Sequence, residues 1–510
     1  MVGGTPARLF AWWMLVSLLV SGATAAATGE DAEATTWLVG LADPATASDG
    51  SLGAKIVSFH PASGFVVVET SDPTFPQRAA EQPGVRYVEA NGFVHASGPT
   101  TTSTDATNQT EGPNDPFWPE QYGPRQVGAL DAWNVTRGDP AVHLCIVDSG
   151  IAPAHDDIPS ERITAMRDLV EHDDLPQDGT GHGTHVASIA AARTDNTLGI
   201  AGLSDVSLLV VRVLDDTNRG TWAAVAAGIE WCTLNGGPRT VINLSLGGSG
   251  DSQAVSDAVA LAHDNGHLVI AAAGNRACDD CVDLPARIPQ VVAVGCTDAA
   301  AARCTYSAGG DTLDLVAPGD AITAADPMLG TSGYSEKTGT SMSTPHVSAA
   351  AALVWSHHPD LPGLSVAHRL VATAAELGAT GFDTAYGHGL LDMPCALLCP
   401  VTPPVAPEAP TVSSTPSQST FRIAWDVPDD PWSEYIEGYR VYVRTGEETA
   451  RLIATTDADT HHIHHAPPLL DDGRYHVAAV NSGGTSALSD PGCRPLVWTP
   501  MGQLDHARSC

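Results

Sequence analysis

The chain has 510 residues, of which 43% are hydrophobic, and a formal charge of -35 that results from 59 acidic and 24 basic residues. A chain of this length can form several domains with full-sized cores. Because a surface that follows phosphates needs a basic patch, this charge balance excludes nucleic acid as an expected partner. It also favours cations near the surface.

The N-terminal residues predict export from the cell. Arg8, the apolar run 9–20 and the small residues 21–27 form the three-part pattern of a signal peptide, which we assign to residues 1–26. The run is short for a membrane span of about 20 apolar residues, and an uncleaved anchor is the alternative. No later run is long enough to span a bilayer, so we expect a secreted, extracellular protein without stable membrane insertion.

The ten cysteines of an exported chain are expected to form disulfide bonds, whose connectivity the sequence leaves open. The alternative is a zinc site with four thiolates, for which the candidates are Cys278, Cys281, Cys296 and Cys304. The second pair of that set is not spaced as in a zinc knuckle, so we favour disulfide bonds.

Residues 37–96 are expected to form a small α+β unit. Strand-like runs at 37–41, 65–69 and 85–88 accompany a short helix candidate at 76–82. Residues 97–113 are rich in Ser, Thr, Gly and Pro and have no apolar periodicity. This segment is expected to be an exposed linker that proteases can reach.

From residue 114 to residue 398, strand patterns alternate with helix patterns. Near-continuous apolar runs, typical of buried parallel strands, lie at 142–147, 207–213, 241–246, 267–273 and 291–294. Helical stretches at 185–193 and 222–232 lie between them. The alternation predicts an α/β fold with a doubly wound, mostly parallel sheet, in which functional sites gather at the carboxyl ends of the strands.

A Pro-rich linker at 399–406 leads to a further unit at 407–492, and a tail follows at 493–510. Strand-like runs in this unit have no helices between them, which predicts an all-β sandwich. Tyr475 is placed as in the tyrosine corner of such sandwiches. The unit resembles a fibronectin type III domain, with Trp425 and Tyr475 as core markers, and its ligand is unknown.

A candidate nucleophile lies in the stretch 339–346, where Gly-Thr-Ser opens an apolar, alanine-rich helix at 347–355. A serine hydroxyl is a weak nucleophile by itself. This interpretation therefore requires a general base, a group that orients the base, and donors for the developing oxyanion. The alternative is that Ser341 or Ser343 is an ordinary helix N-cap.

Three other segments supply the required groups. Asp148 closes a buried strand and could orient an imidazole. His182 lies in a glycine-rich loop at the start of a helix, where glycines permit close approach to Ser341. Asn275 closes another buried strand, and its amide could donate to an oxyanion. A zinc site with His182 and His185 is the rival interpretation, but no Glu separates the two and no third ligand is evident.

In the order Asp148, His182, Asn275 and Ser341, these residues resemble the catalytic set of the subtilisin-like serine proteases, and residues 114–398 resemble the thermitase group of that family. The resemblance implies a secreted serine endopeptidase in which Ser341 attacks a peptide carbonyl while His182 takes and returns the proton. It also implies that Asp148 orients His182, and that Asn275 and the Ser341 N–H bind the oxyanion.

The same resemblance implies a cleft for protein or peptide substrates, with a strand that pairs with an extended substrate backbone. The matching residues are Ser245, Leu246 and Gly247 on that strand, and Ala272 and Gly274 on the opposite wall of the S1 pocket. The segment 276–283 departs from the family, because it is shortened and carries two cysteines. Asp283 then falls near the base of S1, and we hypothesise some preference for Arg or Lys at P1.

A structural calcium ion is the cofactor that the resemblance implies. The donors that match the family's strong site are the side chains of Asp115, Asp157 and Asn196 and the backbone carbonyls of Thr194, Leu198 and Ile200. All are hard oxygen donors, as calcium requires. The alternative is an acidic surface loop without a metal.

Residues 37–96 resemble the inhibitor propeptide of the family, which assists folding and blocks the cleft. We therefore expect the chain to be its own intramolecular inhibitor until it cleaves itself in the linker 97–113. Two competing functions are a processing protease of narrow specificity and a catalytically inactive protein that holds a partner with its C-terminal unit. The intact catalytic set argues against the inactive protein.

Overall fold

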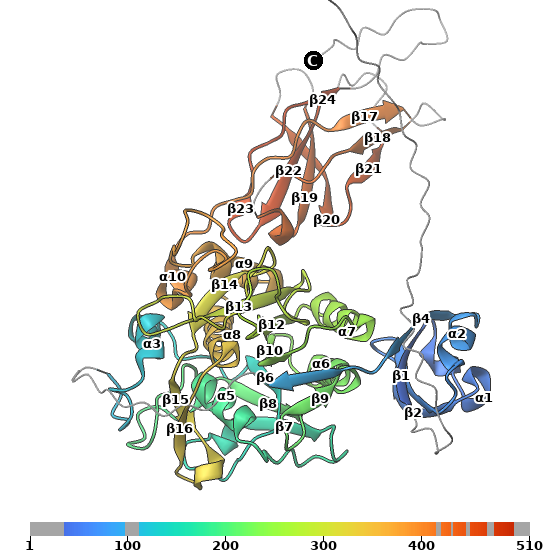
Figure 1. Ribbon diagram of the computed structural model, residues 1–510. Helices are drawn as coiled ribbons and strands as arrows, with labels where there is room; N and C mark the ends of the chain where they lie inside the picture. Colours follow the sequence, from blue (N-terminus) through green and yellow to red (C-terminus); the bar gives the residue numbers. More distant parts are fainter. Residues whose placement is uncertain are drawn as a thin grey trace, which may run out of the picture.

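The computed structural model describes residues 35–96, 112–414, 420–429, 432–444, 449–466 and 474–493. The predicted signal peptide at 1–26, residues 97–111 of the linker and residues 494–510 of the tail lie outside these ranges. Within the described ranges, no helix is long and apolar enough to cross a bilayer. Figure 1 shows a blue N-terminal unit, a large central unit and an orange-red C-terminal unit.

The N-terminal unit is an antiparallel sheet in the order β2-β3-β1-β4, covered by two short helices. Its elements are β1 (Thr35–Leu41), α1 (Asp49–Leu52), β2 (Lys55–His60), β3 (Phe65–Thr70), α2 (Phe75–Ala80) and β4 (Val85–Ala90). Val39, Val66 and Phe75 are fully buried in its own apolar cluster. The predicted strands and helix of this region are therefore present, and β2 is an additional, half-exposed strand.

The central unit contains a seven-stranded sheet in the order β14-β13-β12-β10-β6-β8-β7. The strands are β6 (His143–Asp148), β7 (Ile163–Asp168), β8 (Ser207–Arg212), β10 (Thr240–Leu244), β12 (Leu268–Ala272), β13 (Val291–Thr297) and β14 (Leu315–Pro318). Every neighbouring pair is parallel. The predicted parallel α/β sheet is confirmed, while the edge strands β7 and β14 were not predicted.

Helices cover both faces of this sheet, as a doubly wound fold requires. One apolar cluster includes residues of α5 (His182–Ala191), α8 (Thr340–His357), α9 (Gly363–Ala372) and α10 (Met393–Leu398), together with α4 (Ala129–Trp133). A second cluster contains residues of α6 (Trp222–Asn235) and α7 (Gln253–Asp264). The short α3 (Tyr122–Gln126) and the hairpin of β15 (Ile322–Ala325) and β16 (Tyr334–Lys337) complete the unit.

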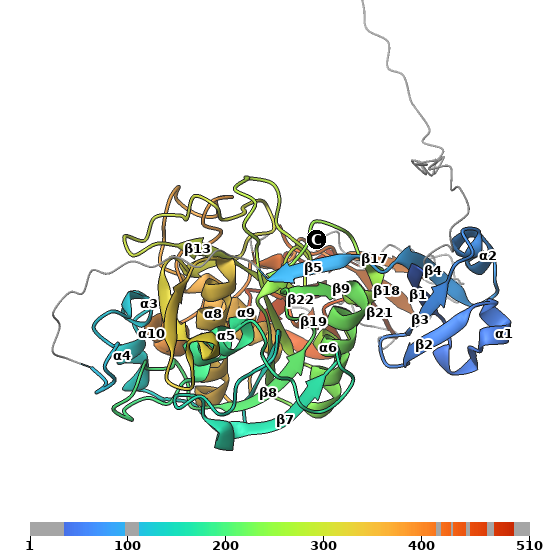
Figure 2. The ribbon, with the colours of Figure 1, turned by 60° about the horizontal axis from the view of Figure 1, so that its bottom comes forward.

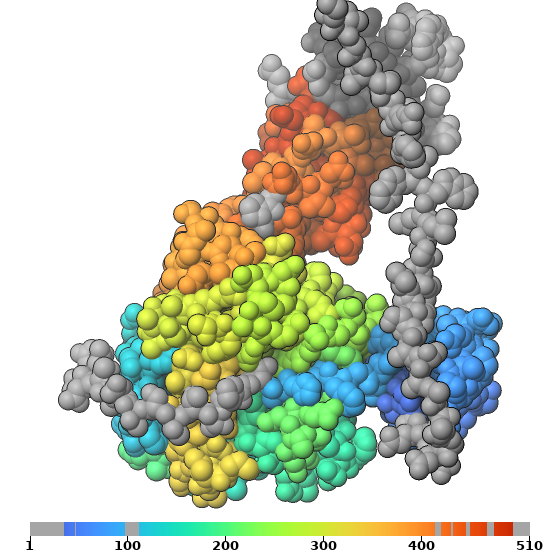
Figure 3. All heavy atoms as spheres, in the orientation of Figure 1, coloured from blue at the N-terminus to red at the C-terminus, as the bar shows by residue number. Residues whose placement is uncertain are grey.

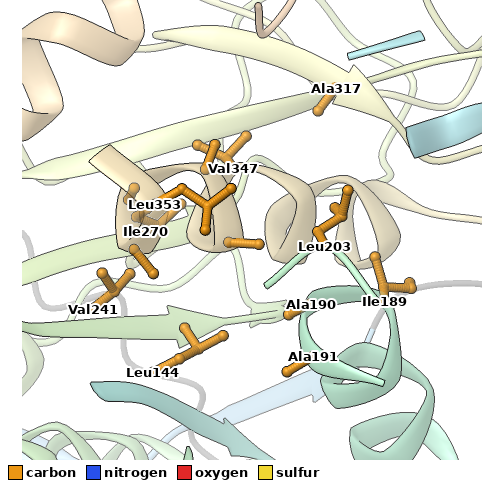
Figure 4. Packing of buried hydrophobic residues seen from close by; sticks show 14 of the residues in the cluster. Leu144, Ile189, Ala190, Ala191, Leu203, Val241, Ile270, Ala317, Val347 and Leu353 are labelled. Atoms are coloured by element: carbon orange, nitrogen blue, oxygen red, sulfur yellow. The ribbon is translucent and has the colours of Figure 1, made fainter. Parts of the chain in front are cut away.

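Helix α8 lies in the middle of the first cluster, and all its residues from Thr340 to Trp355 are buried. Figure 4 shows Val347 and Leu353 of this helix beside Val241 and Ile270, which lie on β10 and β12. A helix with an apolar surface on all sides is stable only in such an interior position. The packing therefore fixes where the N-terminus of α8 lies relative to the strand ends.

The cysteines of the central unit form four disulfide bonds, namely Cys145–Cys232, Cys278–Cys281, Cys296–Cys304 and Cys395–Cys399. The alternative zinc site with four thiolates is wrong, because its four sulfurs are joined in two of these bonds. In the described part of the chain, no three His, Cys, Asp or Glu side chains are grouped so as to hold a metal.

The C-terminal unit consists of two antiparallel sheets. One contains β17 (Thr411–Ser414), β18 (Phe421–Ala424) and β21 (His462–His465), and the other contains β19 (Gly438–Arg444), β20 (Arg451–Asp457), β22 (Arg474–Asn481), β23 (Gly484–Thr485) and β24 (Gly492–Cys493). Buried residues of both sheets, including Trp425 and Tyr475, share one cluster. The Tyr475 hydroxyl lies 3.0 Å from Nδ1 of His465.

The C-terminal unit contacts the central unit through Tyr435, which is buried within the central apolar cluster. Its hydroxyl donates to Oδ1 of Asp314 at 3.2 Å, and its ring stacks on that of His368 with centroids 5.1 Å apart. Oδ2 of Asp314 accepts from the Ala293 N–H at 2.7 Å. Burial raises the pKa of Asp314 to about 7.

This raised pKa predicts a pH-dependent stability. The unfolded chain, in which the Asp314 pKa is near 3.8, loses this proton before the folded chain does, so the carboxyl reduces stability as the pH rises from about 4 to about 7. Asp314→Asn should therefore be more stabilising at pH 8 than at pH 5. The change in melting temperature should be roughly 5–10 °C more positive at pH 8, because the two pH units between pH 5 and the folded-state pKa of about 7 correspond to about 2.7 kcal/mol. Thermal unfolding at both pH values measures the difference.

The matched control is Asp311→Asn, which removes an exposed carboxyl three residues away. It should shift the melting temperature similarly at pH 5 and pH 8. An equal shift at both pH values for Asp314→Asn would show that the buried carboxyl is not the source of the pH dependence.

Candidate active site

Ser341 lies in the first turn of α8. The helix begins at Thr340, and Gly339 occupies the N-cap position without a side-chain hydrogen bond. The Ser341 hydroxyl donates to the carbonyl of Ser245 at 2.8 Å, and the Ser245 hydroxyl donates to the carbonyl of Ser341 at 2.8 Å. The interpretation of Ser341 or Ser343 as the N-cap is therefore wrong, because the cap lies upstream of both.

His182 and Asp148 are in direct contact at the ends of α5 and β6. Nδ1 of His182 lies 2.7 Å from Oδ1 of Asp148, and both side chains are buried. The same carboxylate oxygen accepts from the Ser149 N–H at 2.7 Å. Nε2 of His182 is buried and has no hydrogen-bond partner among the described residues. One ring nitrogen is thus held by a carboxylate while the other is available for a reacting group.

Asp178 fixes the loop that carries His182, a role that sequence analysis did not identify. Oδ1 of Asp178 accepts from the Gly181 N–H at 2.8 Å, and Oδ2 accepts from the Thr184 N–H at 2.8 Å. The Ser149 hydroxyl also donates to Oδ1 at 2.9 Å. An Asp shortly before a predicted helix start is a capping signal and could have indicated this role.

Asn275 is bonded to the helix that carries Ser341. Its Oδ1 accepts from the Thr340 N–H at 3.0 Å, and the Gly274 N–H donates to the Thr340 hydroxyl at 3.1 Å. Nδ2 of Asn275 is buried and has no hydrogen-bond partner in the described chain. Leaving a buried donor unsatisfied costs about 1–3 kcal/mol, so such a donor is expected where a ligand supplies the acceptor.

The other two histidines near this site are neutral and bonded to the backbone. Burial lowers the pKa of His185 to about 3 and that of His346 to about 4. Nε2 of His185 lies 3.1 Å from the Ser335 carbonyl, and Nδ1 of His346 lies 2.8 Å from the Met342 carbonyl. The rival zinc pair of His182 and His185 is not formed, since each ring is engaged elsewhere in the described structure.

A short strand of the N-terminal segment, β5 (Phe93–Ala96), lies between two strands of the central unit. It pairs antiparallel with β11 (Leu246–Gly247) on one side and with β9 (Arg219–Thr221) on the other. Ala96 is opposite Leu246. Figure 2 shows β5 beside β9, and Figure 3 shows the same segment as a blue band across the central unit. Leu246 and Gly247, expected to pair with substrate, thus pair with the chain itself.

The N-terminal unit also contacts the N-termini of α6 and α7. The Glu89 carboxylate accepts from the Ser252 hydroxyl at 2.7 Å and from the Gln253 N–H at 2.8 Å. Oδ1 of Asn91 accepts from the Ala223 N–H at 3.0 Å. Helix N-termini have unsatisfied N–H groups and a partial positive charge, so hydrogen-bond acceptors are stabilised at these positions.

Asp283 lies between Gly247 and Gly274, the two glycines that the resemblance assigns to the substrate cleft. Its N–H donates to the Ala273 carbonyl at 2.8 Å. A Cβ added to Gly274 would lie 2.2 Å from Oδ2 of Asp283, and one added to Gly247 would lie 3.0 Å from its Cβ. Ala272, the last residue of β12, is buried and directly precedes Ala273 in the sequence. Burial raises the pKa of Asp283, while Arg276 opposes that shift.

The predicted calcium ligands Asp115, Asp157 and Asn196 lie together. Nδ2 of Asn196 donates to Oδ1 of Asp157 at 2.9 Å, and its N–H donates to Oδ1 of Asp115 at 3.3 Å. Burial raises the pKa of Asp157 to about 6, and it also raises that of Asp115. Two buried carboxylates thus lie together, an arrangement that suits a hard cation. Oδ1 of Asn196 accepts from the Leu198 N–H at 2.7 Å. Thr194, Leu198 and Ile200 belong to the same loop.

Known proteins resemble the chain over this site and well beyond it. The profile of the Subtilase family matches residues 139–389. Thermitase from Thermoactinomyces vulgaris is 40% identical over 277 residues, which cover 54% of this chain and 96% of that protein. Subtilisin DY from Bacillus licheniformis is 39% identical over 259 residues, or 50% of this chain and 90% of that protein.

A longer match is found with subtilisin amylosacchariticus from Bacillus subtilis subsp. amylosacchariticus. That protein is 32% identical over 400 residues, which cover 76% of this chain and 97% of the relative. Identity at this level over nearly the whole length of several relatives shows common descent of the central unit. The chain belongs to the subtilase family, and it is a serine endopeptidase.

Proposed function

We propose that the chain is the zymogen of a secreted endopeptidase in which Ser341 is the nucleophile, His182 the general base and Asp148 the group that orients His182. The contact of 2.7 Å between His182 and Asp148, with Nε2 of the imidazole left without a partner, is the observation that carries this proposal. A carboxylate on Nδ1 holds the proton there, so that Nε2 presents its lone pair.

The first half of the reaction would form an acyl-enzyme. The Ser341 hydroxyl exchanges its bond to the Ser245 carbonyl for one to Nε2 of His182 and attacks the peptide carbonyl as the proton moves to the imidazole. The imidazolium, stabilised by Asp148, then protonates the leaving amine. In the second half, water attacks the acyl carbonyl as His182 takes its proton, and the imidazolium returns this proton to the Ser341 oxygen as the product acid leaves.

The oxyanion of each tetrahedral intermediate would be bound by Nδ2 of Asn275 and by the Ser341 N–H. The buried Nδ2 has no competing acceptor among the described residues, and its partner oxygen is already fixed by Thr340. The Ser341 N–H belongs to the first turn of α8, where N–H groups point out along the helix axis. Donors fixed before the reaction stabilise developing charge without reorganisation.

Removing the Asn275 donor should lower kcat with little change in KM. Asn275→Ala is expected to reduce kcat about 10²–10³-fold, the loss found when one oxyanion donor is removed from a serine protease of this kind. Asn275→Asp keeps an acceptor for the Thr340 N–H but removes the donor, so it should lose at least as much. Steady-state kinetics on one peptide substrate tests both variants, and an increase in KM alone would contradict the role.

The N-terminal unit is proposed to be the inhibitor propeptide, preceded by a signal peptide at residues 1–26. Support comes from β5, which pairs with β9 and β11 and so covers the strand that should receive substrate. A strand added between two others gains main-chain hydrogen bonds without reading sequence closely. Because Ala96 is opposite Leu246, next to the Ser245 that contacts Ser341, the bond cleaved in maturation should follow shortly after Ala96.

Processing and active-site labelling test the proposed nucleophile together. The wild-type chain should remove its N-terminal unit and react with a fluorophosphonate, and its new N-terminus should lie within about three residues after Ala96, where the paired strand ends. Ser341→Ala should accumulate the unprocessed chain and resist the label. Ser343→Ala, in the same helical turn, is the matched control. It should remove its N-terminal unit and react with the label, as the wild-type chain does. If Ser341→Ala chains were processed normally, another protease would be responsible.

A calcium ion is proposed at Asp115, Asp157 and Asn196, with backbone carbonyls of Thr194, Leu198 and Ile200 as further ligands. The support is the pair of buried carboxylates, whose mutual repulsion a divalent cation would relieve. The ion would hold the loop 194–200 to the segment that contains Asp115. Its contribution would be structural, and no reaction step depends on it.

Calcium removal should therefore lower stability more than activity. Chelation is expected to reduce the melting temperature, because a ligand that binds only the folded chain at about 100 times its dissociation constant adds roughly 2.7 kcal/mol. Asp157→Asn should lower the temperature and abolish the calcium response, while Asp131→Asn, an exposed carboxyl, should retain it. A melting temperature that does not respond to chelation would contradict the site.

The C-terminal unit is proposed to be a fibronectin type III-like domain that binds or spaces, joined by the Pro-rich linker at 399–406. Its two antiparallel sheets share a core that contains Trp425 and Tyr475. Residues 467–473 lie outside the described ranges, and β22 begins at Arg474. Fold resemblance assigns no ligand to this unit.

A further inference from the structure

The carboxylate of Asp283 is buried beside a cation. Asp283 is 7% exposed, and Nη2 of Arg276 lies 2.8 Å from its Oδ1. The same nitrogen carries two hydrogens and also donates to the Cys281 carbonyl at 2.7 Å. An ionised carboxylate has about four acceptor sites, so Oδ1 can accept from a second donor.

The position of this carboxylate relates it to the substrate. It lies against Gly247 and Gly274, which are the two walls of the S1 pocket if the proposed function is correct. Gly274 directly precedes Asn275, the proposed oxyanion donor. A buried carboxylate with a spare acceptor site, located between the walls of a substrate pocket, is expected to meet a donor on the substrate.

Arg276 is held beside Asp283 by a short loop that a disulfide bond closes and that backbone hydrogen bonds join to a neighbouring segment. The Cys278–Cys281 disulfide closes this loop. The Ala277 N–H donates to the Tyr306 carbonyl at 2.8 Å, and the Cys281 N–H donates to the Gly309 carbonyl at 3.0 Å. The Arg276 side chain is 43% exposed, so water solvates the guanidinium and it can leave the carboxylate at small cost.

We propose that Arg276 is a displaceable counter-ion of Asp283 and that it sets how strongly the enzyme prefers basic residues at P1. A P1 Lys or Arg side chain donates to the carboxylate of Asp283 and competes with Arg276 for its charge. An apolar P1 residue leaves the pair intact and buries no unpaired carboxylate. The pair therefore lets one pocket accept both kinds of P1 residue, and Arg276 weakens the selectivity that Asp283 alone would give.

The test uses the self-processed enzyme and peptide substrates that differ only at P1, which is Arg, Leu or Glu. Arg276→Gln should raise the ratio of kcat/KM for P1 Arg to that for P1 Leu about two- to fivefold, since a partly exposed ion pair is worth about this factor. Asp283→Asn should lower the same ratio. It should also raise cleavage after Glu, because Arg276 is then unpaired. In Asp283→Asn enzyme, the added Arg276→Gln change should abolish this gain in cleavage after Glu.

Two controls separate the possible outcomes. Arg167→Gln removes a surface cation of the edge strand β7, where Arg167 pairs with Asp174. It should leave the P1 ratio unchanged. The rate of fluorophosphonate labelling reports whether each variant still has an intact active site. If labelled Arg276→Gln enzyme kept the wild-type ratio, or if the gain in cleavage after Glu persisted when Arg276→Gln was added to Asp283→Asn, the inference would be overturned. If the wild-type enzyme neither reacted with the label nor cleaved any of the peptides, the proposed function itself would fail.

Discussion

Burial of α8 is the constraint on which the rest of the central unit depends. The helix is buried on all sides, between the sheet and the helices of the same face. Its first turn is bonded to Ser245 on one side and to Asn275 on the other, each just beyond a strand end. The proposed nucleophile, oxyanion donor and substrate strand are therefore parts of one rigid connection, and the α5 loop with Asp148 brings the proposed base to it.

The sequence predicted the parts of this structure that are dominated by burial. Continuous apolar runs identified the central strands, but β7 has a half-exposed pattern and β14 has only four residues, so neither produced a signal. The apolar pattern identified only residues 347–355 of α8, because Ser, Thr and Pro at 340–346 are weak helix formers that tertiary packing overrides. The residues of the site were found because each lies at a strand end or helix start, whereas Asp178 acts only through the loop that it caps.

The strand β5 could not be found from local pattern, because its structure comes from its partners. Four residues, Phe93–Ala96, have too little periodicity to identify a strand, and the strands that bind them lie more than a hundred residues further along the chain. Pairing on both edges removes two open strand edges that would otherwise attract other chains. In the proposed zymogen, this pairing protects a surface that would be exposed in the active enzyme, with the same main-chain bonds that a substrate would make.

The loop from Arg276 to Asp283 shows how charge and covalent structure act together at one edge of this surface. An isolated carboxylate at Asp283 would carry the full cost of burial, which its raised pKa reflects. A fully buried partner would lower that cost but would also occupy the pocket permanently. A half-exposed guanidinium, held at the rim by a disulfide-closed loop, offsets the charge and still leaves an acceptor for an incoming side chain. Selectivity at P1 then depends on the difference between two cations competing for one carboxylate, and not on the carboxylate alone.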